Sequence, residues 1–188
     1  MNISTAEKKL LLETARKSII SFFTKEAIPE PNFEKHPVLK SNCGAFVTIT
    51  QKGKLRGCIG YIISDQPLFE TICDAAVQAS QNDPRFPSVK QNEIEKLSLE
   101  ISILSEPFSL NNYDEIEVGK HGLILEEKGY RGLLLPQVPI EHRMNKEEYL
   151  DAICRKTGLP SGYWKDKKLK LSGFTATVFS EESLKSVE

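Results

Sequence analysis

The sequence lacks the short patterns that identify the commonest catalytic and cofactor-binding sites. It contains no G-x-G-x-x-G, no G-x-x-x-x-G-K-[ST], no H-E-x-x-H and no G-x-S-x-G. These patterns mark dinucleotide sites, phosphate-binding loops, zinc proteases and nucleophile elbows, respectively. Those chemistries therefore have no support in the sequence, and we predict no cofactor.

An excess of charge and a long apolar run are also missing. Lysine and arginine number 25 against 26 aspartates and glutamates, for a formal charge of −1. No overall field then favours nucleic acid or an anionic membrane. The chain starts with the polar stretch MNISTAEKK and has no apolar run long enough to span a bilayer. We expect a cytoplasmic protein that binds neither a membrane nor nucleic acid.

Paired cysteines are the third absence. The potential soft metal ligands are four cysteines and three histidines, namely Cys43, Cys58, Cys73, Cys154, His36, His121 and His142. They are widely separated and form no C-x-x-C pair, whereas structural metal sites usually bring ligands in close pairs. We predict no metal site, and we expect reduced thiols in a cytosol.

The apolar spacing that is present predicts a mixture of helices and strands. Helices are expected at 5–23 and 68–80, and strands at 44–50, 55–63, 97–104 and 170–179, before a frayed tail. Strands and helices do not alternate strictly, which favours an α+β fold with a mixed, largely antiparallel sheet and flanking helices. We predict a single domain over 1–188.

The second half of the chain echoes the first. The stretch HGLILEEKGYRGLLLP resembles GAFVTITQKGKLRGCIG, and YLDAICRKTG resembles FETICDAAVQ with Ile-Cys placed alike. An internal duplication of a hairpin-helix unit would explain this echo. The identities are few, so coincidence is the other explanation, and both stay open here.

The stretch LRGCIGY raises a question about its glycines. Gly57 and Gly60 stand inside a predicted strand, where glycine costs backbone entropy and packs nothing. Strand alternation places Arg56, Cys58 and Gly60 on one face, opposite Leu55. A nearby guanidinium favours the thiolate, and bare glycines would leave room for a ligand. In the alternative interpretation Cys58 is a small packing residue and the glycines mark a bulge or a close strand crossing.

Acidic and basic side chains elsewhere allow two interpretations each. Glu100, on the polar side of LSLEISIL, is either a solvated residue or a partner for Arg56. Asp83 and Arg85 in DPRFP form either a capped turn with its own ion pair or a rigid loop that presents Arg85 to an anion.

Two further candidates lie in the second half. His121 precedes a strand and is either a general acid or base near neutral pH or an ordinary turn residue. Gln137 follows LLLP and hydrogen-bonds either a ligand or its own loop.

At LRGCIG the sequence resembles the AMMECR domain family, called protein A of the AmmeMemoRadiSam system in prokaryotes. GAFVTI, DPRFP, LEISILSEP, GKHGL and GLLLPQV follow in the family's order over nearly the whole chain. The resemblance implies an α+β domain with a larger lobe, a smaller lobe at about 119–165 and a cleft near LRGCIG. It also implies two partners: a Memo-like protein, similar to extradiol dioxygenases, and a radical S-adenosylmethionine enzyme.

The chain departs from the family at one segment. After LPQV the family commonly has a Gly-Trp-Asp step, whereas this sequence has Met144 and Asn145 where Trp and Asp are usual. Any site role that the Trp carries in relatives is therefore in doubt, and His142 is particular to this sequence.

Two functional hypotheses follow. In the first, the protein is an enzyme or enzyme component acting on a small molecule or a modified macromolecule. Cys58 is then the thiolate nucleophile, Arg56 stabilises it and orients an anionic substrate, and Glu100 or His121 moves protons. The predicted ligand-binding residues are Gly57, Gly60, Asp83, Arg85 and Gln137. In the second, the chain is a non-catalytic binding or adaptor module for a Memo-like protein or a radical S-adenosylmethionine enzyme.

Overall fold

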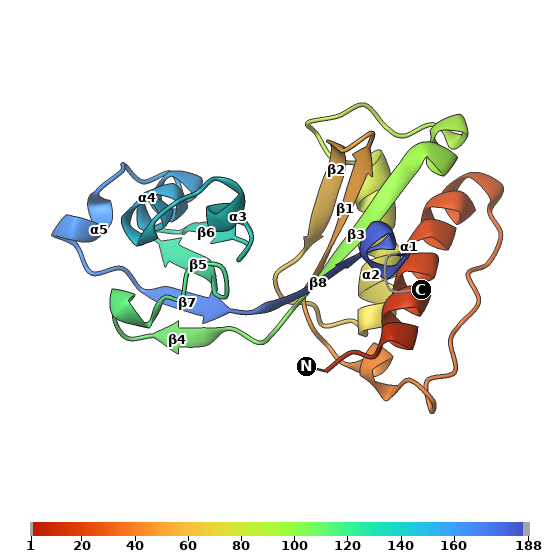
Figure 1. Cartoon of the computed structure of the whole chain (residues 1–188), viewed down its shortest axis with the longest axis horizontal. Coiled ribbons are helices and arrows are strands. Elements are labelled where there is room, and N and C mark those ends of the chain that lie inside the picture. Colours follow the sequence, from red (N-terminus) through yellow and green to blue (C-terminus); the bar gives the residue numbers. More distant parts are fainter. Residues whose placement is uncertain (1, 186–188) are drawn as a thin grey trace. The chain divides into compact units, whose positions relative to one another are not determined.

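The structure is a computed structural model that describes residues 2–185, and it divides into two units. Unit 1 comprises the described residues up to Leu104 and those from Thr177 onward, and unit 2 is Ser105–Ala176 (Figure 1). Unit 2 covers a wider range than the 119–165 expected for a smaller lobe. None of the helices found within residues 2–185 is both long and apolar enough to cross a membrane.

Unit 1 is built around a sheet with the strand order β2-β1-β3-β8. Its strands are β1 (Ala45–Gln51), β2 (Lys54–Tyr61), β3 (Leu97–Leu104) and β8 (Ala176–Ser180). Its helices are α1 (Thr5–Thr24), α2 (Leu68–Gln81) and α6 (Glu181–Lys185), with 3-10 turns at Pro37–Lys40 and Gln91–Lys96. β1 pairs antiparallel with both β2 and β3, so β2 is an edge strand.

The helices of unit 1 pack on one face of this sheet. Ser4 and Glu7 form a capping box at the start of α1. The alternate residues Ala45, Val47 and Ile49 of β1 are fully buried. They belong to one apolar core with the buried residues of α1 and α2. The residues between them face the other way and are half-buried, so the core lies on the helix side of the sheet.

Unit 2 has a second four-stranded sheet with the order β4-β7-β5-β6. Its strands are β4 (Phe108–Leu110), β5 (Gly122–Glu127), β6 (Tyr130–Leu134) and β7 (Leu171–Phe174). Its helices are α3 (Val138–Glu141), α4 (Lys146–Lys156) and α5 (Tyr163–Asp166), with a 3-10 turn at Tyr113–Glu115. Leu123 and Leu125 of β5 pack in a separate core with Tyr149 and Ile153 of α4.

The segment that departs from the family has a structural role in unit 2. Asn145 is the N-cap of α4: its side chain accepts the backbone N–H of Glu148, whose carboxylate accepts the backbone N–H of Asn145. Asparagine and aspartate are both favoured at this position. Met144 packs, partly buried, against the unit 2 core.

The α+β fold class is confirmed, with three corrections. The strands form two sheets rather than one. The stretch 170–179 is two strands, because the chain passes at Thr175 from the sheet of unit 2 to that of unit 1. The expected frayed tail forms α6. Its first residue, Glu181, accepts hydrogen bonds from the Arg16 guanidinium of α1 on both carboxylate oxygens, at 2.7 and 2.6 Å. Residues 186–188 of that tail lie outside the described part of the chain.

The hairpin, helix and strand of unit 1 recur in unit 2. In unit 1, β1 and β2 form a hairpin, α2 follows, and β3 then pairs with β1. In unit 2, β5 and β6 form a hairpin, α3 and α4 follow, and β7 then pairs with β5. The echo in the sequence thus corresponds to the same arrangement of elements in each unit.

Candidate functional site

The strand that carries LRGCIG contains a β-bulge. Cys58 lies opposite Thr48 and Gly57 opposite Ile49, but the next residue of β1, Thr50, lies opposite Leu55. Arg56 is therefore the extra residue, and strict alternation fails at this point. Leu55, expected on the face opposite to Cys58, shares the face of Cys58, because Thr50 and Thr48 point the same way.

Three polar side chains form a row across the sheet of unit 1. Thr48 lies opposite Cys58 on one side and opposite Glu100 on the other, so all three face away from the helices. The Thr48 hydroxyl donates a hydrogen bond to Cys58 Sγ at 3.3 Å, and each of the three residues is half-buried. We call Cys58, Thr48 and Glu100 the polar row. Alternation predicts the shared face of Cys58 and Glu100, but the sequence analysis did not select Thr48.

Arg56 binds a loop rather than the polar row. Its guanidinium donates to the backbone oxygens of Pro87 at 2.6 Å and Ser88 at 3.3 Å, and it pairs with the Glu93 carboxylate at 3.4 Å. The Lys90 backbone N–H and the Arg56 guanidinium together hold the pKa of Glu93 below its ordinary value. The carboxylate that pairs with Arg56 here is that of Glu93, which is not among the candidates selected from the sequence.

Asp83 and Arg85 bind the main chain of Cys58. The Cys58 N–H donates to Asp83 Oδ2 at 2.8 Å, and Arg85 Nη2 donates to the Cys58 carbonyl oxygen at 3.2 Å. The two side chains also pair with each other at 2.7 Å. We call Asp83 and Arg85 the edge brace. Its hydrogen bonds, above all those from Arg85, lower the pKa of Asp83 to about 2.

The Cys58 thiol has a raised pKa. Burial is the main cause, and the negative charges of Asp83 and Glu100 act in the same direction. The hydrogen bond from Thr48 and the positive charge of Arg85 oppose this rise only in part. Arg85 is thus the cation whose charge favours the thiolate of Cys58, and the stabilising role expected of Arg56 stays a prediction.

Both glycines of the motif permit close contact with other main-chain atoms. A Cβ at Gly57 would lie 2.1 Å from the carbonyl oxygen of Ala79 in α2. A Cβ at Gly60 would lie 2.2 Å from the carbonyl oxygen of Ala45. Real Cβ atoms essentially never come so close, so the backbone itself requires glycine at both positions. This requirement does not depend on any ligand.

His121 and Gln137 belong to unit 2. His121 is buried: its Nδ1 accepts the Glu117 backbone N–H at 3.2 Å, and its ring lies edge-on to Phe108. Gln137 precedes α3, and its side-chain oxygen is buried with no hydrogen-bond partner among the described residues. The other predicted site residues, Cys58, Arg56, Glu100, Asp83, Arg85, Gly57 and Gly60, all belong to unit 1.

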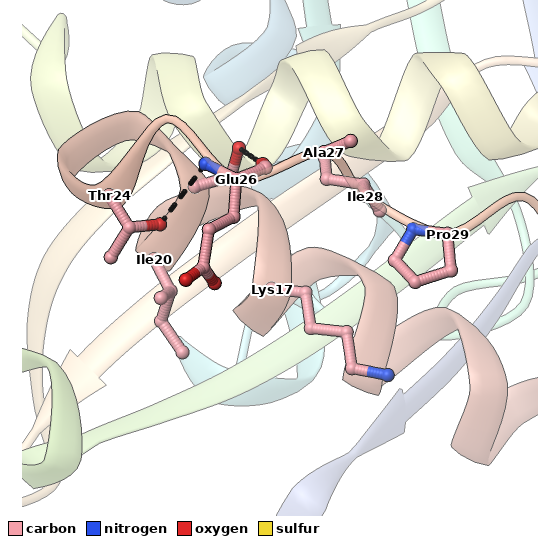
Figure 2. A pocket seen from close by; sticks show the side chains of 8 residues that line it. Lys17, Ile20, Thr24, Glu26, Ala27, Ile28 and Pro29 are labelled. Carbon is pink, nitrogen blue, oxygen red and sulfur yellow. Dashed lines mark hydrogen bonds between the residues drawn. The ribbon is translucent and has the colours of Figure 1, made fainter.

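Cavities are found away from LRGCIG. Figure 2 shows one of about 230 Å³ between α1, which carries Lys17 and Ile20, and the segment after it, which carries Glu26 and Ile28. Another, of about 350 Å³, lies in unit 2. It is lined by His142, Met144, Glu148, Asp151 and Arg155. Neither of these two cavities includes a residue of β2, and the cleft expected near LRGCIG stays a prediction. Within residues 2–185 no group of three or more His, Cys, Asp or Glu side chains is placed to hold a metal ion.

The sheets and helices define a two-unit α+β protein with a half-buried thiol on a braced edge strand. The profile of the AMMECR1 family matches residues 12–179, and the chain belongs to this family.

Three similar proteins illustrate how closely the chain matches known sequences and structures. Protein Mbar_A1807 of Methanosarcina barkeri is 41% identical over 188 residues, which cover 96% of this chain and 93% of that protein. Protein Ta0236 of Thermoplasma acidophilum is 42% identical over 180 residues, with coverages of 92% and 86%. The crystal structure of the uncharacterized protein PH0010 from Pyrococcus horikoshii matches with a TM-score of 0.84 and 38% identity, covering 94% of this chain and 92% of that one.

Proposed function

We propose that this protein is an enzyme or enzyme component that acts on a small molecule or a modified macromolecule, with Cys58 as its nucleophile. The observation that supports this proposal is the polar row. A thiol, a hydroxyl and a carboxylate lie side by side on three neighbouring strands, on the face of the sheet opposite to the core. A nucleophile, a hydrogen-bond donor to it and a proton acceptor are the groups that covalent catalysis by cysteine requires.

The proposed chemistry begins from a neutral thiol. The sulfur attacks an electrophilic carbon of the substrate, a C–S bond forms, and the leaving group departs with the electrons of the bond that breaks. In this step the Thr48 hydroxyl turns its own proton toward Glu100 and its oxygen takes up the thiol proton, so that Glu100 gains a proton and then gives it to the leaving group. Thr48 also stabilises negative charge on Cys58 Sγ through its hydrogen bond. Glu100 is preferred to His121 as the base because it shares the row with the thiol.

The test compares two thiols of unit 1 that are both half-buried. Wild type, Cys58→Ser and the matched control Cys73→Ser are incubated separately with the small-molecule fraction and with the macromolecular fraction of a cell extract. Consumed and formed compounds, and adducts on the protein, are followed by mass spectrometry. We expect wild type and Cys73→Ser to convert the same compound and Cys58→Ser to leave it unchanged. Equal conversion by Cys58→Ser would overturn the proposal, and conversion by none of the three would count against an enzyme that works alone.

A further inference from the structure

The edge brace occupies the place that a neighbouring strand would have. β2 is an edge strand, and edge strands leave alternate N–H and C=O groups without a strand partner. At Cys58 both groups are bound by side chains: the N–H by Asp83 at 2.8 Å and the carbonyl oxygen by Arg85 at 3.2 Å. The main chain at the thiol is therefore held on its outer side as it would be inside a sheet.

The brace is itself well fixed. The Asp83 carboxylate also accepts the Arg85 backbone N–H at 3.1 Å and two guanidinium N–H groups at 3.0 and 2.7 Å. The Asp83 side chain is only 2% exposed, whereas that of Arg85 is 55% exposed. Pro84 and Pro87 limit the backbone of the loop that carries the pair. Asp83 is thus the buried anchor, and Arg85 reaches from it to the strand.

We propose that Asp83 and Arg85 are positioning residues for Cys58, which fix the main chain at the thiol and balance the charge that the thiol faces. This inference rests on the proposed function only in giving Cys58 the role of nucleophile. The contacts of Arg85 that support this inference are its ion pair with Asp83 and its hydrogen bond to the Cys58 carbonyl oxygen.

The two members of the brace act on the thiol in opposite electrostatic directions. The charged groups that face Cys58 are Arg85 and Asp83 from the loop and Glu100 from β3, and Thr48 of β1 contributes its hydroxyl. Arg85 favours the thiolate, whereas the two carboxylates disfavour it. Loss of either brace residue loosens the same strand, but the two losses shift the pKa of the thiol in opposite directions. This opposition separates a positioning role from a merely structural one.

The experiment measures alkylation of Cys58 in the full-length protein. Iodoacetamide is added across a range of pH, and the rate at the Cys58 peptide is followed by mass spectrometry. Asp83→Asn keeps an oxygen that can accept the Cys58 N–H but loses the charge, so its rate profile is expected to shift to lower pH. Arg85→Gln loses the cation and is expected to shift to higher pH, whereas Arg85→Lys retains a positive charge and is expected to stay near wild type.

The matched control is Glu93→Gln. It removes the ion pair between Arg56 and the segment that follows the brace, without touching Cys58, and is expected to leave the profile unchanged. Circular dichroism checks that each variant is folded. If Asp83→Asn fails to fold, Arg85→Gln and Arg85→Lys decide the question, because Arg85 is the exposed member of the pair.

Profiles that shift in the same direction for Asp83→Asn and Arg85→Gln, or that do not shift, would overturn the positioning role. If Asp83→Asn is unfolded, an Arg85→Gln profile that does not shift is by itself enough to overturn the positioning role. Conversion of the compound by Cys58→Ser would instead overturn the proposed function and leave the alkylation result intact. The two failures are therefore distinguishable.

Discussion

The two units share a hairpin, a following helix and a returning strand, and they also share an Arg-Gly pair in the second strand of the hairpin. Gly57 of β2 lies against the carbonyl oxygen of Ala79 near the end of α2. Gly132 of β6 lies against Thr157 at the end of α4. In both units the missing side chain lets the end of the helix approach the strand. The glycine therefore belongs to the scaffold and is no mark of a site.

The residue after this glycine is where the units differ. Cys58 stands in the polar row with Thr48 and Glu100. The matching row of unit 2 is Leu133, Ile124 and Ser172. One arrangement of elements thus carries a thiol and a carboxylate in one unit and mainly aliphatic side chains in the other. The comparison separates the glycine, which both units share, from the polar row, which belongs to the candidate site of unit 1 alone.

The arginine of the pair differs as well. Arg131 of unit 2 pairs with Glu126, its partner on the neighbouring strand, at 2.9 Å. Arg56 is displaced by the bulge and binds Glu93 in the segment after α2. The bulge therefore distinguishes β2 from β6. Through it, Arg56 hydrogen-bonds the loop that also carries the edge brace.

The largest effect should come from filling the shared glycine positions. In Gly57→Ala the new Cβ meets a main-chain oxygen at 2.1 Å, and we expect a loss of about 3 kcal/mol in the free energy of unfolding. In Gly132→Ala it meets the Thr157 hydroxyl at 2.4 Å and the nearest main-chain atom only at 3.1 Å. Rotation of that hydroxyl gives up its hydrogen bond to the Ile153 carbonyl oxygen, so a smaller loss of about 1 kcal/mol is expected. Urea unfolding followed by circular dichroism measures both.

Second substitutions sharpen this result. Thr157→Ala should make Gly132→Ala less costly than it is in the wild-type background, because it removes the hydroxyl that lies nearest to the new Cβ. Ala79→Gly should not rescue Gly57→Ala, because the contacting oxygen belongs to the main chain. Equal losses in the two units, or rescue by Ala79→Gly, would contradict the structural difference between them.

The next effect concerns stability in acid. The pKa of Asp83 is about 2 in the folded protein, below its ordinary value in an unfolded chain. The ionised carboxylate therefore stabilises the fold at pH values above the unfolded pKa, and this stabilisation is lost as the pH falls through the folded pKa. We expect this group to contribute about 2 kcal/mol that disappears between about pH 4 and pH 2. Urea unfolding at several pH values should show a shallower fall in stability for Asp83→Asn than for wild type.

The comparison in unit 2 is Asp151. Its carboxylate accepts the Gly162 backbone N–H at 2.7 Å and the Trp164 indole N–H at 2.8 Å, which lower its pKa. No guanidinium hydrogen-bonds this carboxylate among the described residues, so Asp151→Asn should flatten the acid dependence less than Asp83→Asn does. An Asp83→Asn curve parallel to that of wild type would refute this account of the brace.

A smaller effect is expected within the polar row. Thr48→Val keeps the β-branched shape but removes the hydroxyl that donates to Cys58 Sγ, which should raise the pKa of the thiol further. Iodoacetamide labelling of Cys58 should shift to higher pH, with a change in stability of no more than about 1 kcal/mol. Ile124→Val, at the matching position of unit 2, is the control and should leave the Cys58 profile unchanged. Faster labelling in Thr48→Val would show that the hydroxyl shields the sulfur instead.

The smallest effect compares the cysteines of the two following helices. Cys73 of α2 is half-buried, Cys154 of α4 is buried, and burial raises the pKa of each thiol. In the native protein Cys73 should react with iodoacetamide before Cys154, and in strong urea the two rates should converge. Equal rates in the native protein would mean that α4 opens as readily as α2.

Much of the fold follows from local patterns in the sequence. The helix over 5–23, the strand over 44–50 and the alternation in the first four residues of 97–104 each depend on neighbouring residues, and the structure has them close to where they are expected. The division of 170–179 into two strands depends on partners distant in the sequence. The residues around Thr175 do not indicate that the strand before it and the strand after it join different sheets.

The candidate site was predictable only in part, for a related reason. Alternation places Cys58 and Glu100 on one face, but the bulge at Arg56 shifts the register by one residue, and such a shift reverses the face of everything before it. The pairing of Arg56 with Glu93 therefore could not be read from spacing. Thr48 could have been found by counting back through the hairpin from Cys58, had the bulge been known.

The division of the chain also bears on the order in which the protein is made. Synthesis proceeds from the N-terminus, so α1 and β1–β3 leave the ribosome before unit 2, whereas β8 and α6 leave after it. Until then β3 has no outer neighbour, and the Arg16 guanidinium has no Glu181 to bind. The unit that carries the candidate site is the first to be started and the last to be completed, so a nascent chain stalled before residue 176 would expose the free edge of β3.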